Sequence, residues 1–372
     1  METKSKNSFT EDMTPAFSFG LPFIFVPLMI IAWIYGGWTI LAVPIFGYVI
    51  ITIFDFLIGT KMIAPKFKPD EDNKKYKIIL FAWPPIQLFL IFGSLVAIFS
   101  FEHLNFIEAT GLMLVQGLIT GAVGIVFAHE LMHQKTRFER FLSDLLMGMA
   151  IYGHFRTEHV LVHHRHVGTE KDAVTARFGE GFYKFFIRIV PQCFFSAWET
   201  EKEMLTKKER PFWDFLNPFY IYFGLSILFL ISSLIIGGIL GVLCFFIQAL
   251  IAVLHLEVVN YIEHYGLVRQ KLENGKFEPT KPHHSWNANH HASNLLLINL
   301  QKHSDHHARP NKTYESLQSY DENDAPQLPF GYPLMVLISL IPALWRKVMD
   351  PKVIEWRNKF YPDLTDWGKS QA

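Results

Sequence analysis

Residues 109–133, ATGLMLVQGLITGAVGIVFAHELMH, join an apolar run to two histidines that lie four residues apart. The run at 109–128 contains no charged residue, and a helix needs about 20 such residues to cross the hydrocarbon core of a bilayer. His129 and His133 follow at once, and residues four apart lie on one face of a helix. The stretch therefore predicts a membrane-spanning helix whose end carries a pair of metal ligands.

Long uncharged segments recur in this chain, which has 372 residues, is 50% hydrophobic and is only 18% charged. Two of them, 13–54 and 215–254, break near the middle at glycine pairs, and 78–101 is a third. Helices of soluble proteins rarely run this far without charge, so buried helices of a large soluble core are the weaker alternative. We expect an all-α integral membrane fold with six transmembrane helices, at residues 16–36, 38–58, 78–101, 108–128, 216–236 and 238–259.

The distribution of Lys and Arg predicts the orientation, because cytoplasmic loops carry an excess of both. The turns after the first, third and fifth spans carry neither, whereas the fourth span is followed by Lys135, Arg137 and Arg140. The loop after the second span carries Lys61, Lys66, Lys68, Lys74, Lys75 and Lys77. The N-terminus and the 61–77 loop should therefore be cytoplasmic.

The same distribution predicts a helical cytoplasmic cap, made of residues 129–214 and 260–372. The chain is then a single domain, 1–372, and a multi-pass protein of the inner (cytoplasmic) membrane. Residues 330–344 are apolar but too short for a span, and we interpret them as an interfacial or re-entrant segment.

Further histidines form three more short motifs, which the predicted orientation places on the same side as HELMH. They are EHVLVHH, NYIEHYG and HSDHH, with His159, His163, His164, His264, His303, His306 and His307. Spacings of three and four let the residues of each motif aim at one point. Nine imidazoles exceed the ligands of one ion, so two metal ions are expected. Imidazole suits iron, zinc, copper and nickel, so the ligand type leaves the metal open.

HELMH also fits two other kinds of site. It matches H-E-x-x-H of zinc metalloproteases, with Glu130 as general base, and it contains the E-x-x-H of soluble carboxylate di-iron bundles. A zinc metalloprotease site leaves most of the clustered histidines unexplained. A carboxylate di-iron site needs another E-x-x-H motif, which the histidine clusters lack. A non-catalytic metal-binding membrane protein is a further alternative.

The composition excludes some kinds of cofactor site and gives no indication of a nucleic-acid partner. The only cysteines, Cys193 and Cys244, exclude an all-cysteine iron–sulfur cluster or a rubredoxin-type site within the chain. The formal net charge is zero, so nothing indicates a nucleic-acid partner.

The order H-x-x-x-H, H-x-x-x-H-H and H-x-x-H-H resembles the membrane di-iron superfamily of fatty acid desaturases and hydroxylases. NYIEHYGL at 260–267 and LQKHSDHH at 300–307 narrow the resemblance to the integral-membrane alkane hydroxylase (alkane 1-monooxygenase) family. The likeness runs from FDFLIGT at 54–60 to about residue 353, through stretches such as KPHHSWNANH at 281–290.

The resemblance implies two iron ions, with ligand roles for His129, His133, His159, His163, His164, His264, His303, His306 and His307 and no other catalytic residue. It implies hydroxylation of the terminal methyl of n-alkanes to 1-alkanols with O2. Two electrons would come from reduced rubredoxin, which an NAD(P)H-dependent reductase supplies. Oxidation of an unactivated methyl needs redox chemistry, which iron has and zinc lacks. The alternative within the superfamily is a fatty-acyl desaturase or hydroxylase.

Several other residues are candidates for supporting roles. Acceptors for the imidazole N–H groups are expected among Glu130, Glu158, Asn260, Glu263 and Asp305, which lie beside or between the histidines. Gly47, on the second span, removes a side chain and could lengthen a substrate channel. The sequence leaves open the preferred alkane length, the oligomeric state and which histidines hold which iron.

Overall fold

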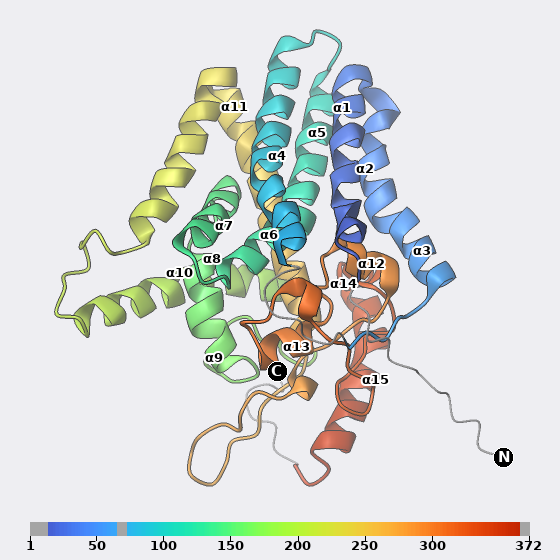
Figure 1. Ribbon diagram of the computed structural model, residues 1–372, viewed down its shortest axis with the longest axis vertical. Helices are drawn as coiled ribbons and strands as arrows, with labels where there is room; N and C mark the ends of the chain where they lie inside the picture. Colours follow the sequence, from blue (N-terminus) through green and yellow to red (C-terminus); the bar gives the residue numbers. More distant parts are fainter. Residues whose placement is uncertain (1–13, 65–72, 365–372) are drawn as a thin grey trace.

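The computed structural model describes residues 14–64 and 73–364, and within these ranges it is helical, with isolated β-bridges but no sheet (Figure 1). The expected all-α architecture is confirmed for these ranges. Some of the predictions on membrane orientation concern residues outside the described ranges. These are the N-terminal tail before residue 14, Lys66 and Lys68 in the loop after the second span, and the C-terminal end of the cap.

Five helical segments of the described chain are long and apolar enough to cross a membrane. They are Ala16–Tyr35, Gly37–Ile58, Lys74–Ser100, Phe106–Met132 and Phe219–His264. The first contains a 3-10 segment, Ala16–Ile24, before α1 (Phe25–Tyr35), and the second runs through a 3-10 turn, α2 (Ala42–Pro44), a π-helical turn at Ile45–Ile50 and α3 (Ile51–Ile58). The third is α4 (Asn73–Ser100). The fourth is α5 (Phe106–Ile119), a π-helical turn at Thr120–Gly124 and α6 (Ile125–Met132).

The fifth segment, α11 (Phe219–His264), covers both of the last two expected spans. It is interrupted at Gly237 and Gly238, and Gly238 has φ +60°, a conformation that glycine adopts at little cost. Figure 1 shows the chain turning back at this bend, so that the arm at 239–264 descends behind α4. The two arms are close at the bend, because a Cβ placed on Gly241 would lie 2.2 Å from the Ser233 carbonyl oxygen.

Two helices continue beyond the expected ends of their membrane spans. The helix of the span expected at 238–259 continues to His264, and the helix of the span expected at 108–128 continues to Met132. Polar residues in the first extension have partners inside the protein: Asn260 Nδ2 donates to Glu257 Oε2 at 3.0 Å, and Tyr332 Oη donates to Glu263 Oε1 at 3.0 Å. Because these partners replace water, the helix remains regular up to the histidine.

Glycines bring the fourth segment, Phe106–Met132, and the second arm of α11 into close contact. A Cβ on Gly117 would lie 2.7 Å from the Gln248 carbonyl oxygen, and one on Gly121 would lie 2.6 Å from His255 Cβ. Small residues spaced by four let helices in a membrane approach closely. The Thr120 hydroxyl between them donates to Gln248 Oε1 at 3.0 Å. The arm that ends at His264 is thereby fixed against the helix that leads to His129.

The remaining helices lie around the lower ends of the spans in Figure 1. They are α7 (Arg137–Met149), α8 (Phe155–Thr157), α9 (His164–His166), α10 (Phe182–Thr206), α12 (His291–Leu296), α13 (His303–Ala308), α14 (Tyr332–Ser339) and α15 (Pro342–Phe360). The segment 330–344 thus forms a short helix, α14, and the start of α15.

Candidate metal centre

The nine histidines of the four motifs converge into two groups. Each residue offers one nitrogen, and the nitrogens of a group all lie within 4.8 Å of one another. One group holds His129, His133, His159, His164 and His306, and the other holds His163, His264, His303 and His307. The structure therefore brings together every histidine that the motifs singled out, and it divides them five to four.

The division separates one of the three i, i+4 pairs. His159 and His163 were expected to aim at one point, but they lie in different groups. The backbone explains the difference, because Glu158–His163 is π-helical, with hydrogen bonds from i to i+5. Residues five apart then come into line, and His159 Nε2 lies 3.1 Å from His164 Nε2. The motif therefore contributes ligands to both groups.

The five-histidine group is assembled from three parts of the chain. His129 lies in the last turn of α6 and His133 directly follows that helix, while His306 comes from α13. His133 Nε2 lies 3.1 Å from His159 Nε2, and His164 Nε2 lies 3.1 Å from His306 Nε2.

The four-histidine group joins the end of α11 to α13. His264 Nε2 lies 3.1 Å from His303 Nε2, which lies 2.9 Å from His307 Nε2. His307 Nε2 in turn lies 3.2 Å from His163 Nε2.

The spacing of these nitrogens fits metal coordination. Two nitrogens bound to one ion at about 2.1 Å lie about 3.0 Å apart when the bonds are perpendicular, and about 3.4 Å apart in a tetrahedron. The observed separations of 2.9 to 3.2 Å match the perpendicular arrangement.

The protonation state of the imidazoles also fits. Burial lowers the pKa of His133 to about 3, and it holds the pKa values of other members well below their usual value, namely His159, His164, His303, His306 and His307. Neutral imidazoles keep the lone pair that a metal requires. The donor set is therefore suited to two ions such as iron.

Comparisons with known proteins agree with this site. A model of the fatty acid desaturase family matches residues 105–339. Alkane 1-monooxygenase 2 of Pseudomonas aeruginosa is 37% identical over 85% of this chain and 84% of its own length, and alkane 1-monooxygenase of Acinetobacter baylyi is 37% identical over 87% and 78%. The chain belongs to the alkane hydroxylase family. A more distant relative, the hydroxylase component of xylene/toluene monooxygenase of Pseudomonas putida, is 29% identical over 68% of this chain and 67% of its own length.

In this member of the alkane hydroxylase family, four of the five residues expected to accept hydrogen bonds from the histidines have side chains that make no hydrogen bond to a histidine within 14–64 and 73–364. Glu130 accepts from Gln134 Nε2 at 2.7 Å, and Asn260 donates to Glu257. Asp305 accepts from Arg309, Lys312, the Gln318 amide and Tyr320, so it fixes α13 to the following loop. Both Glu158 carboxylate oxygens are buried and have no hydrogen-bond partner among the described residues. Glu263 does reach a histidine, with Oε2 3.3 Å from His303 Nε2.

One acceptor was missed by the sequence motifs. Asp172 Oδ2 lies 3.0 Å from His163 Nδ1 and also accepts from the Thr175 hydroxyl at 2.6 Å. Burial acts to raise the pKa of Asp172, but the adjacent His163 imidazole and the Thr175 hydroxyl together hold that pKa below its usual value. Asp172 follows the histidine by nine residues, in the loop after α9, so no helical spacing connects the two.

A third group with metal-binding side chains, Glu278, His283 and His284, is explained by hydrogen bonds. The Tyr361 hydroxyl lies among them, 2.7 Å from His284 Nε2 and 3.2 Å from His283 Nε2, and donates to Glu278 Oε1. The Lys281 amide donates to His284 Nδ1 at 2.9 Å, so the neutral ring carries its proton on Nε2. That nitrogen then has no lone pair for an ion.

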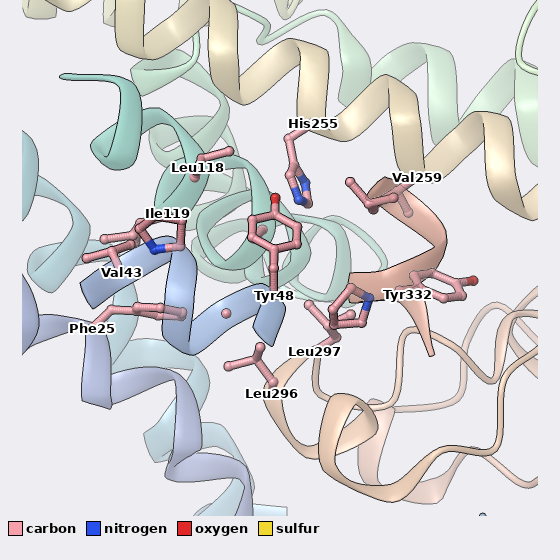
Figure 2. Close-up of a pocket in the computed structure, with 15 residues that line it drawn as sticks. Phe25, Val43, Tyr48, Leu118, Ile119, His255, Val259, Leu296, Leu297 and Tyr332 are labelled. Atoms are coloured by element: carbon pink, nitrogen blue, oxygen red, sulfur yellow. The ribbon is translucent and has the colours of Figure 1, made fainter. Parts of the chain in front are cut away.

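Gly47 lines an apolar cavity of about 40 Å³ between the second span, α5 and α11 (Figure 2). Val43, Leu118 and Ile119 contribute to its wall, and Tyr48 and His255 point toward each other across it. His255 precedes His264 by nine residues on one helix, which is about 14 Å along the axis. The cavity thus lies inside the spans, at a distance from the histidines that an extended hydrocarbon chain can bridge.

Proposed function

We propose that this protein hydroxylates the terminal methyl group of n-alkanes to 1-alkanols at two iron ions. The observation that carries the proposal is the convergence of all nine motif histidines into two groups with metal-like nitrogen spacing. Relatives named alkane 1-monooxygenase, at 35 to 38% identity, supply the substrate class.

Iron suits the reaction because an unactivated methyl can be oxidised only by a redox-active centre with O2, which is the chemistry that bound iron supplies. One oxygen atom enters the alcohol and the other leaves as water, and this balance needs two electrons and two protons. The role of the chain is to hold the ions with neutral imidazoles, to keep the site buried, and to position the methyl group.

The electrons come from reduced rubredoxin, with an NAD(P)H-dependent reductase upstream. The sequence supports an external donor, since it has only two cysteines and no G-x-G-x-x-G nucleotide motif. Cys193 and Cys244 are both free.

The proposed arrangement in the membrane has six spans, with the two arms of α11 as the fifth and sixth. Support comes from the bend at Gly237 and Gly238. The lysines and arginines that follow the even-numbered spans, and their absence after the odd-numbered ones, also support it. The N-terminus and the cap, with both histidine groups, then face the cytoplasm, in a single domain of the inner membrane. An alkane dissolved in the bilayer would enter between the spans, and the cavity beside Gly47 is the candidate for the channel.

A fatty-acyl desaturase or hydroxylase is the second candidate, favoured by the match of residues 105–339 to the fatty acid desaturase family. A zinc protease built on HELMH is disfavoured, because His129 and His133 share their group with three other histidines, whereas a catalytic zinc has about three protein ligands and an open position.

Product analysis separates these candidates. The purified protein, reconstituted with iron, rubredoxin, reductase and NAD(P)H, is supplied with n-alkanes of increasing length or with fatty acids, and products are identified by gas chromatography. We expect 1-alkanols that carry oxygen from isotope-labelled O2. Modified fatty acids without any alkanol would reject the alkane proposal, and absence of iron from active protein would reject the metal assignment.

A further inference from the structure

Glu263 approaches the four-histidine group from the inside. Its Oε2 lies 3.3 Å from His303 Nε2, the same nitrogen that faces His264 and His307. The outer nitrogen of that ring, His303 Nδ1, is buried and has no hydrogen-bond partner in the described part of the chain. The carboxylate is therefore on the side of the ring where an ion would bind.

Asp172 shows the alternative arrangement in the same group. It contacts His163 Nδ1, while His163 Nε2 faces His307 at 3.2 Å. A carboxylate behind a ligand ring orients the imidazole and raises its basicity, and this contact has that geometry. Glu263 differs because it contacts the inner nitrogen, so orienting the ring does not account for its position.

The two groups differ by one ligand, with five nitrogens in one and four in the other, and the Glu263 oxygen does not lie within 4.8 Å of all four nitrogens of the smaller group. A carboxylate oxygen at 3.3 Å from a ligand nitrogen is close to the separation of neighbouring donors on one ion, which is about 3.0 Å for perpendicular bonds. We propose that Glu263 is the fifth ligand of the ion in the four-histidine group, and that its side chain turns toward the ion so that one carboxylate oxygen binds. The proposal rests on the proposed function, because it requires an iron in that group.

Charge supports the same conclusion. Neutral imidazoles bring no negative charge and Asp172, behind His163, supplies only one, so a divalent ion bound by histidines alone would leave one positive charge uncompensated in a buried site. Glu263 is only 2% exposed, and a buried carboxylate is costly without a cation or good hydrogen bonds. Direct ligation would neutralise one charge of the ion and would also compensate the carboxylate.

Neighbouring residues hold the carboxylate in place. Tyr332 Oη donates to Glu263 Oε1 at 3.0 Å, and the Trp286 amide donates to the Glu263 carbonyl oxygen at 2.9 Å. One carboxylate oxygen is thereby fixed, and Oε2 is left for the ion. Tyr332 also lines the cavity beside Gly47, and Figure 2 shows its hydroxyl directed away from Tyr48. Tyr332 is thus a positioning residue that joins the cavity wall to the ligand.

The test compares the iron-loaded full chain with Glu263→Gln, Glu263→Ala and the control Glu257→Gln. Glu257 is buried on the same arm of α11 but accepts hydrogen bonds from Tyr152 and Asn260 and contacts no histidine of either group. Iron per chain and the Mössbauer spectrum of the reduced protein are measured. We expect Glu263→Ala to lower iron from about two to about one per chain, and Glu263→Gln to alter the signal of one iron only. Glu257→Gln should leave both values unchanged.

Two iron ions per chain with unaltered signals in both Glu263 variants would overturn the proposal while leaving the proposed function intact. Absence of iron from the unsubstituted protein would instead reject the proposed function. If the variants do not fold, an experimental structure of the iron-loaded natural chain decides the question. A Glu263 oxygen within about 2.2 Å of the ion supports ligation, and one that lies farther from the ion rejects it.

Discussion

His159 and His164 direct their Nε2 atoms toward each other at 3.1 Å, although they lie five positions apart in the sequence. This contact depends on the π-helical turn Glu158–His163, which changes the period of the helix. The same turn sends His163 to the other group, where it meets His307 from α13. One irregular turn therefore decides how one motif serves two ions.

His264 is expected to be essential for the four-histidine group, because it is the member that α11 supplies. His264→Ala should reduce hydroxylation with reconstituted rubredoxin by more than about 100-fold and lower the iron content. Turnover and iron per chain are the measurements. His255→Ala, on the same arm, is the control for iron content, since His255 belongs to neither group. Full turnover in His264→Ala would remove this residue from the ligand set.

Asp172 should support iron binding through His163. Asp172→Asn removes the charge behind the ligand ring, and loss of such partners typically weakens metal affinity about 10- to 100-fold. Competition with a chelator measures the change. The matched control is Glu201→Gln, because Glu201 is a buried carboxylate that accepts from Thr157 and contacts no histidine of either group. Equal iron affinity in the two variants would show that the contact between Asp172 and His163 has no role in binding.

Gly47 should set the length of alkane that the cavity accepts. A Cβ at this position would meet Phe25 at 3.6 Å, an ordinary contact, so a larger side chain can be accommodated but would fill the cavity. Gly47→Leu should shift the products of an alkane mixture toward shorter chains, as measured by gas chromatography. Gly224→Leu is the control, because a side chain there would enter open space. An unchanged product distribution would place the channel elsewhere.

Gly121 should be required for packing rather than for chemistry. A Cβ there would lie 2.6 Å from His255 Cβ and 2.9 Å from the Ala252 carbonyl oxygen. Overpacking of this kind typically costs about 1 to 3 kcal/mol, which exceeds the gain of up to about 1 kcal/mol in helix propensity. Gly121→Ala should therefore lower the melting temperature in detergent, whereas Gly224→Ala, in open space, should not. Equal melting temperatures would contradict the proposed close contact.

The sequence was sufficient for features that depend on local composition and on fixed spacing. Uncharged runs of sufficient length predicted the apolar helices, and the glycine pair at 237–238 predicted the bend in α11. The motif order predicted the family, which the comparisons confirm. Helix ends were less certain, because the last turn of α11 is stabilised by partners such as Tyr332, which lies far along the chain.

The sequence by itself determined the helical class, the family and the identity of the nine histidines that converge. The tertiary structure alone decided their division into five and four, the contact of Asp172 with His163, and the side from which Glu263 approaches His303. The physical reason is that these features depend on an irregular helical turn and on loops and helices that meet from distant parts of the chain. Neither follows from a repeating period of residues.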